Sequence, residues 1–103
     1  MVFIETPTFA ADRDEHFTDE AFAAFQQMLA DQPDAGDLIS GGKGFRKVRF
    51  AMPGRGKSGG GRVIYVWRTS EAQILLVAVF AKNAQANLTP AQVKALVKAY
   101  SGG

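Results

Sequence analysis

Residues 62–68 read Arg-Val-Ile-Tyr-Val-Trp-Arg, and this stretch decides the fold class. Its β-branched and aromatic side chains favour a strand. Alternation along a strand places Val63, Tyr65 and Trp67 on one face. The other face then holds Ile64 and Val66 between two arginines. The sequence therefore predicts a strand with one apolar face and one face that carries charge at both ends.

Strands are also predicted on both sides of this stretch. Residues 45–52 alternate, with Val48, Phe50 and Met52 on one face and Lys47 and Arg49 on the other. Residues 69–73 form a turn, and residues 74–81 are apolar throughout, as in the middle of a covered sheet. Three consecutive strands favour an antiparallel meander. A further short strand is expected at residues 2–5.

Two helices are predicted to pack against this sheet. Thr18 caps the first and Pro33 ends it, with apolar residues at helical spacing between them. Residues 89–92, Thr-Pro-Ala-Gln, form a capping box that begins the second. Polar residues 10–17 are expected to form a loop or a short helical turn. The prediction is one domain, residues 1–103, of the α/β (α+β) class, with a twisted, mainly antiparallel sheet of about four strands.

The charges are segregated along the chain. Residues 1–37 carry nine acids and one base, whereas residues 38–70 carry eight bases and no acid. Such segregation suggests a basic face built for a polyanion. The alternative is that the acidic half folds over the basic half and neutralises it. Because the acids lie far from the basic segment in the sequence, no Ser-His-Asp arrangement can be argued.

Composition limits the remaining classes of function. The chain has no cysteine, which excludes disulfides and thiolate metal sites. The longest apolar run, residues 74–81, is too short to span a bilayer. The first residues lack the basic start and long apolar run of a secretory signal. We therefore expect a cytoplasmic protein that does not insert into a membrane.

Residues 51–58, Ala-Met-Pro-Gly-Arg-Gly-Lys-Ser, fit a permissive form of the P-loop pattern. A P-loop must lead into a helix whose N-terminus holds phosphate. Here three glycines and the strand 62–68 follow instead, and glycine disfavours helix by ~1 kcal/mol per residue. We interpret the stretch as a flexible loop that presents Arg55 and Lys57 to a partner.

The single histidine and the aromatic residues of strand 62–68 are weaker candidates for a functional site. His16, the only histidine, lies among charged residues without the spacing of a metal site and is expected to be solvated. Tyr65 and Trp67 could stack on bases, but their strand positions favour the core. By contrast, Lys47, Arg49 and Arg62 share one sheet face if the two strands pair. A cluster of cations suits a phosphodiester.

The chain resembles the RelE/ParE superfamily of toxin–antitoxin toxins, and most closely its HigB-like branch. The resemblance covers nearly the whole domain and the order of its elements. It rests on these segments: residues 36–39 (GDLI), 44–49 (GFRKVR), 56–65 (GKSGGGRVIY), 81–83 (AKN) and 88–89 (LT).

This resemblance implies a toxin that enters the ribosomal A site and cuts mRNA. The ribose 2′-OH attacks the adjacent phosphate, so neither metal nor cofactor is needed. The implied catalytic residues are Lys47, as a proton-transfer group or only a phosphate ligand, and Arg49 and Arg62, which hold the phosphate. The predicted contacts to RNA or the ribosome come from Lys43, Arg46, Arg55, Lys57, Arg68, Lys82 and Asn83.

The implied partners are the 70S ribosome with its mRNA and a cognate antitoxin. In HigB-like systems the antitoxin is HigA-like and carries a helix-turn-helix, so operator DNA is contacted only through it. Two alternatives remain open: a ParE-like inhibitor of DNA gyrase, and a module that binds RNA or the ribosome without chemistry.

Overall fold

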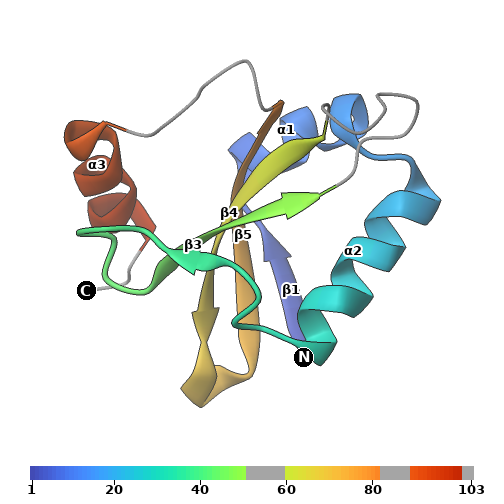
Figure 1. Ribbon diagram of the computed structural model, residues 1–103, viewed down its shortest axis with the longest axis horizontal. Helices are drawn as coiled ribbons and strands as arrows, with labels where there is room; N and C mark the ends of the chain where they lie inside the picture. Colours follow the sequence, from blue (N-terminus) through green and yellow to red (C-terminus); the bar gives the residue numbers. More distant parts are fainter. Residues whose placement is uncertain (51–59, 82–88, 101–103) are drawn as a thin grey trace.

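The computed structural model describes residues 1–50, 60–81 and 89–100. A five-stranded sheet has helices on both faces (Figure 1). Its strand order is β1-β5-β4-β3-β2. The elements in chain order are β1 (Val2–Glu5), α1 (Pro7–His16), α2 (Asp19–Asp31), β2 (Asp37–Leu38), β3 (Phe45–Phe50), β4 (Gly61–Arg68), the 3-10 turn η1 (Thr69–Glu71), β5 (Gln73–Ala81) and α3 (Pro90–Tyr100).

The predicted meander is confirmed. Strands β3, β4 and β5 pair antiparallel with their neighbours. Strand β3 ends at Phe50, and the last two residues of the predicted strand, Ala51 and Met52, lie outside the described ranges. The long apolar strand β5 lies inside the sheet and is covered on both faces, which explains its continuous apolar sequence.

The prediction of about four strands was one short. Strand β2 has only two residues, too few to show a pattern, and it extends the sheet beyond β3. Strand β1 pairs parallel to β5 at the opposite edge, so the sheet is mixed.

The prediction of a loop or a short turn at residues 10–17 was wrong, because Pro7–His16 forms a ten-residue helix. Thr6 caps it: its Oγ1 accepts a hydrogen bond from the Phe9 N–H at 3.1 Å and donates to the Val77 carbonyl at 2.8 Å. Thr6 and Pro7 are the N-cap and N1 signal that also marks α3. The signal was therefore present in the sequence, just before the polar stretch.

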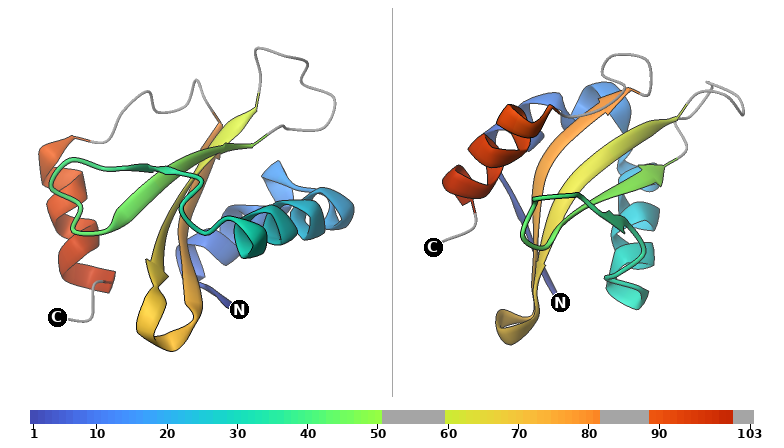
Figure 2. Two further views of the ribbon diagram at one scale, coloured as in Figure 1. Left: turned by 60° about the horizontal axis from the view of Figure 1, so that its bottom comes forward. Right: turned by 60° about the vertical axis from the view of Figure 1, so that its left-hand side comes forward.

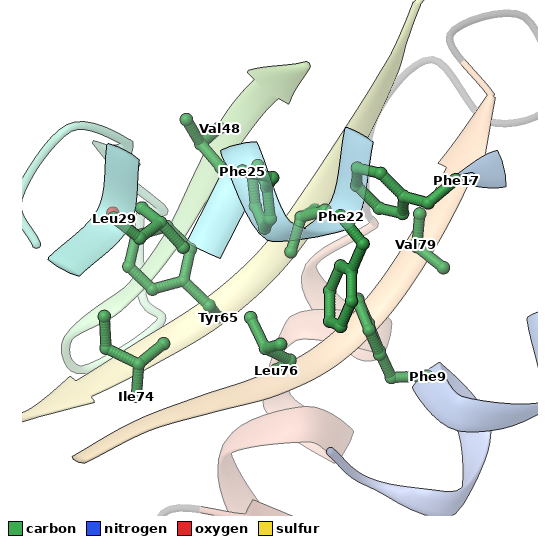
Figure 3. Close-up of a cluster of buried hydrophobic side chains, with 11 residues drawn as sticks. Phe9, Phe17, Phe22, Phe25, Leu29, Val48, Tyr65, Ile74, Leu76 and Val79 are labelled. Carbon is green, nitrogen blue, oxygen red and sulfur yellow. The ribbon is translucent and has the colours of Figure 1, made fainter. Parts of the chain in front are cut away.

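Helices α1 and α2 cover one face of the sheet with an aromatic core (Figure 3). Phe17 contacts three other rings of this core: it is stacked on Phe50 with ring centroids 4.3 Å apart, and it is tilted against Phe22 and Phe25 at 5.3 and 5.2 Å. The predicted cap of α2 is confirmed, since Thr18 Oγ1 accepts from the Ala21 N–H at 3.1 Å. We call this side of the sheet the closed face.

Helix α3 packs on the opposite face, away from α1 and α2 (Figure 2). Leu96, Val97 and Tyr100 contact a second, smaller core that includes Phe45 and Ile64. The capping box is confirmed: Thr89 Oγ1 accepts from the Gln92 N–H at 3.1 Å, and Gln92 Oε1 accepts from the Thr89 N–H at 2.9 Å. We call this side of the sheet the open face.

Candidate functional site

Three cations gather on the open face. Arg49 and Arg62 are direct partners across the β3–β4 ladder, and Lys47 lies two residues earlier on β3, opposite Ile64. Residues directly opposite in an antiparallel pair share a face, with Cβ atoms about 5 Å apart. The strand pairing therefore brings together the three side chains whose shared face the sequence predicted.

The start of β4 is fitted closely beside this cluster. A Cβ added at Gly61 would lie 2.6 Å from Phe50 Cζ and 2.7 Å from the Phe80 carbonyl oxygen. Only glycine allows the strand to pass here. Arg62 follows at once, and its Nη1 donates to the Gly61 carbonyl at 3.1 Å. The sequence 60–62 thus sets the position of Arg62.

Acidic side chains do not neutralise the cluster. Arg49 is exposed, and Lys47 and Arg62 are half-buried. Within the described part of the chain, both ion pairs belong to Arg13, which contacts Glu5 at 3.2 Å and Asp14 at 3.4 Å. Six of the nine acids of residues 1–37 lie on α1 and α2, which cover the closed face, with the sheet between them and the cations. These two helices therefore do not fold over the three cations, as the alternative interpretation of the charge segregation had expected.

One acid nevertheless lies beside the cluster, and the sequence reasoning missed it. Asp37 of β2 is the direct partner of Lys47 on β3. Both residues line a pocket of about 640 Å³ between the β2–β3 connection and the start of α3. Asp37 had been counted with the distant acidic segment. The position of Asp37 in the segment 36–39 (GDLI) could have marked it as a candidate site residue. Its pairing with β3 could not be predicted, because a two-residue strand leaves no pattern in the sequence.

Arg46 and Arg68 lie apart from the three cations. Arg46 belongs to the other face of β3, and its Nη1 donates to the Gly36 carbonyl at 2.7 Å and to the Asp34 carbonyl at 3.4 Å. Arg68 ends β4 far from Arg62, and its Nη2 donates to the Tyr100 carbonyl at 2.7 Å. Both guanidinium groups hold parts of the fold together.

The remaining predicted contacts divide into two groups. Lys43 is exposed in the β2–β3 connection, in the left-handed region at φ 49°. The others lie outside the described ranges: Arg55, Lys57, Lys82 and Asn83. The P-loop-like stretch also lies outside them, and the next described element is a strand rather than a helix.

The core interpretation of Tyr65 and Trp67 is confirmed. Tyr65 is fully buried, and its hydroxyl donates to the Pro33 carbonyl at 2.7 Å and accepts from the Gly36 N–H at 3.0 Å. Burial raises the pKa of Tyr65 above its ordinary value of 10.0, against a smaller lowering by the Gly36 hydrogen bond. Trp67 packs against the closed-face core. Tyr65 therefore anchors the segment that leads into β2.

His16 ends α1, with Nδ1 2.9 Å from the Asp12 carbonyl oxygen, which makes Nδ1 the donor. In residues 1–50, 60–81 and 89–100, no three or more His, Cys, Asp or Glu side chains gather as metal ligands would. No helix in these ranges is long and apolar enough to cross a membrane.

A comparison to protein families agrees with the fold. The family model described as the RelE toxin of the RelE / RelB toxin–antitoxin system matches residues 2–102. Members of this family are toxins that an antitoxin partner accompanies. Because the match covers almost the entire chain, this protein belongs to the RelE toxin family.

Proposed function

We propose that this toxin is a ribosome-dependent endoribonuclease of the HigB-like branch, which cuts mRNA in the ribosomal A site and so inhibits translation. The observation that carries the proposal is the position of Arg49 opposite Arg62, with Lys47 on the same face. Two guanidinium groups side by side suit the oxygens of one phosphodiester. A RelE-family toxin with this pair on an accessible face has the groups needed to hold the scissile phosphate of an RNA.

The reaction is a transesterification within the RNA. The ribose 2′-oxygen forms a bond to the adjacent phosphorus, its proton passes to a base, and the bond from phosphorus to the 5′-oxygen breaks. The leaving oxygen takes up a proton, and the products are a 2′,3′-cyclic phosphate and a 5′-hydroxyl. Arg49 and Arg62 offset the negative charge that grows on the phosphate. Lys47 transfers a proton or serves as a third phosphate ligand. This chemistry requires neither metal nor cofactor.

The partners follow from this activity. The 70S ribosome presents the mRNA, and the site of action is therefore the cytoplasm. The antitoxin, HigA-like with a helix-turn-helix, neutralises the toxin by covering the open face or by preventing entry into the ribosome. Operator DNA is contacted through the antitoxin.

The test is primer extension on an mRNA translated in vitro with purified protein. Wild type is expected to give discrete cuts that depend on ribosomes. Arg62→Ala should slow cutting by roughly 100-fold, the usual cost of removing one group that stabilises the transition state. Lys98→Ala is the matched control, because it removes the same charge from an exposed position in the last turn of α3.

The outcomes separate the competing functions. An enzyme loses cutting in Arg62→Ala and keeps it in Lys98→Ala. Intact mRNA with unaffected translation would contradict the proposal and favour a gyrase inhibitor, which a DNA supercoiling assay detects. Blocked translation of intact mRNA would instead indicate a binding module.

A further inference from the structure

We propose that Phe17, on the closed face, is a positioning residue for the pair Arg49 and Arg62 on the open face. It acts through the Phe50 ring, which holds β3 and β4 together next to the two arginines. The inference rests on the function proposed above, and it gives a role in that function to a residue of the helical layer. We call each pair of directly opposite residues in the β3–β4 ladder a rung.

The two arginines are not joined by ladder hydrogen bonds of their own. The Phe45 carbonyl accepts from the Ile39 N–H at 2.9 Å, so the odd-numbered residues of β3 direct their backbone groups toward β2. Arg49 and Arg62 therefore form a non-hydrogen-bonded pair, the kind in which the side chains lie closer together. Like charges at this spacing repel each other. Their separation depends on the hydrogen-bonded rungs on either side.

One of these two rungs pairs Phe50 with Gly61, and it is the last rung that the structure describes. A Cβ added at Gly61 would lie 2.6 Å from Phe50 Cζ. The ring therefore lies directly against the Gly61 backbone, immediately before Arg62. An aromatic side chain that covers a cross-strand glycine makes up for the missing side chain. The Phe50 ring thus joins the end of β3 to the start of β4.

Phe17 holds the Phe50 ring from the side of the helices. The two rings are stacked, with centroids 4.3 Å apart and planes inclined by 23°. The Phe25 ring meets Phe50 edge-on at 6.0 Å. Such pairs favour one arrangement of the rings beyond what the burial of their area contributes. Because Phe50 is only half-buried, its position against Gly61 depends on these two contacts.

Phe17 is itself fixed by the junction of the two helices. Its N–H donates to the Arg13 carbonyl at 2.9 Å, where α1 ends. It also directly precedes Thr18, the N-cap of α2, and its ring lies 5.3 Å from that of Phe22. This is the spacing of a hydrophobic staple, which fixes the angle at which a chain enters a helix. The junction therefore gives the last rung a firm support.

Phe9 offers a comparison within the same core (Figure 3). It is fully buried, and its ring lies 6.0 Å from that of Phe22. Among the described residues, the ring contacts of Phe50 come from Phe17 and Phe25. Both Phe9 and Phe17 stabilise the core, but Phe17 also supports the rung beside the arginines. Contact with this rung, rather than membership of the core, distinguishes the positioning residue.

The first measurement tests the rung itself and does not depend on any activity. Phe17→Leu is compared with Phe9→Leu, because both replace a ring of one buried core and both should unfold at a lower urea concentration than wild type. Hydrogen exchange followed by NMR compares the N–H of Gly61 with that of Val63, on the other side of the arginine pair. Relative to Val63, Gly61 should exchange roughly tenfold faster in Phe17→Leu than in Phe9→Leu, because a stacked pair is lost.

The second measurement tests the consequence for cutting during translation in vitro. Phe17→Leu should lower kcat per folded molecule on the order of 10- to 100-fold, because the arginines no longer hold the phosphate in one position. Its KM for programmed ribosomes should not change, since contacts made equally in the ground state and the transition state remain. Phe9→Leu should cut like wild type. Gly61→Ala should fail as Phe17→Leu does, because its Cβ collides with the Phe50 ring.

Three results would overturn the inference. They are an exchange ratio of Gly61 to Val63 that is the same in both phenylalanine variants, a changed ratio with normal cutting by Phe17→Leu, and an equal loss of cutting in Phe9→Leu. A wild type that does not cut mRNA would contradict the proposed function instead. The exchange ratio would then still decide whether Phe17 holds the rung.

Discussion

The two faces of the sheet are built for different purposes, although the same strands supply both. On the closed face, β3 and β4 contribute Val48, Val63 and Tyr65 to a core sealed by α1 and α2. On the open face, the same two strands present Lys47, Arg49 and Arg62, with α3 covering the apolar residues beside them. Alternation along a strand thus lets one segment stabilise the fold and form the site.

The difference between the faces is also one of electrostatic cost. Like charges directly opposite in a sheet destabilise it, and Arg49 lies opposite Arg62. On the closed side of the same strand, Arg46 donates to the Gly36 carbonyl and stabilises a connection. Arg46 thus stabilises the fold, whereas Arg49, three residues further along the strand, destabilises it through the repulsion from Arg62. An anion-binding site requires cations of the second kind, whose charge the fold does not compensate.

Breaking the closed face should have the largest effect on stability. Phe9 is fully buried, with its ring 6.0 Å from that of Phe22. Phe9→Ala should lower the free energy of unfolding by about 3–5 kcal/mol, measured by urea denaturation. Leu38→Ala, in the edge strand β2, should cost less than about 0.5 kcal/mol, because Leu38 is exposed. Equal losses in the two variants would contradict the claim that the core under α1 and α2 stabilises the fold.

A subtler change on the closed face is Tyr65→Phe, which keeps the ring and removes the hydroxyl. The Gly36 N–H and the Pro33 carbonyl then lose their partner. The free energy of unfolding should fall by about 1–3 kcal/mol near neutral pH. Cutting per folded molecule should not change, because the hydroxyl lies across the sheet from the cations.

The same variant has a signature at alkaline pH. The unfolded chain releases the Tyr65 proton near pH 10.0, whereas the folded chain holds it because burial raises the pKa. This contribution to stability is therefore complete below pH 10.0 and is lost as the pH rises through the folded pKa. Tyr65→Phe lacks this loss, so its difference from wild type should narrow above pH 10.0. A constant difference across that range would show that Tyr65 titrates alike in both states.

The elements with local signals could be predicted from the sequence. The alternation at residues 62–68 and the Thr89–Gln92 box fixed β4 and the start of α3 without reference to the rest of the chain. Helix α1 was missed although Thr6 and Pro7 carried its signal, because its polar residues hide the one buried side chain, Phe9. Local sequence signals were therefore sufficient to predict β4, α3 and α1, although the signal at Thr6 and Pro7 was not used to predict α1.

The candidate site likewise contains features that could be predicted from the sequence and features that could not. Alternation was enough to place Lys47 and Arg49 on one face, since this needs only a strand. The partners of Arg46 and Lys47 could not be predicted, because Gly36 and Asp37 reach them through tertiary pairing of a two-residue strand. Such pairing depends on the position of α2 and on the Tyr65 hydroxyl that holds Gly36. No local pattern encodes it.

The most direct test of the account is the unfolding free energy of Arg49→Gln beside that of Arg46→Gln. Both variants make the same substitution on one strand. Arg49→Gln should stabilise the protein by about 0.2–1 kcal/mol, because it relieves the repulsion with Arg62, while cutting on ribosomes falls. Arg46→Gln should destabilise it by about 1 kcal/mol, because the Gly36 carbonyl loses its donor. A loss of stability in Arg49→Gln equal to that in Arg46→Gln would contradict the claim that the open face gives up stability to hold an anion.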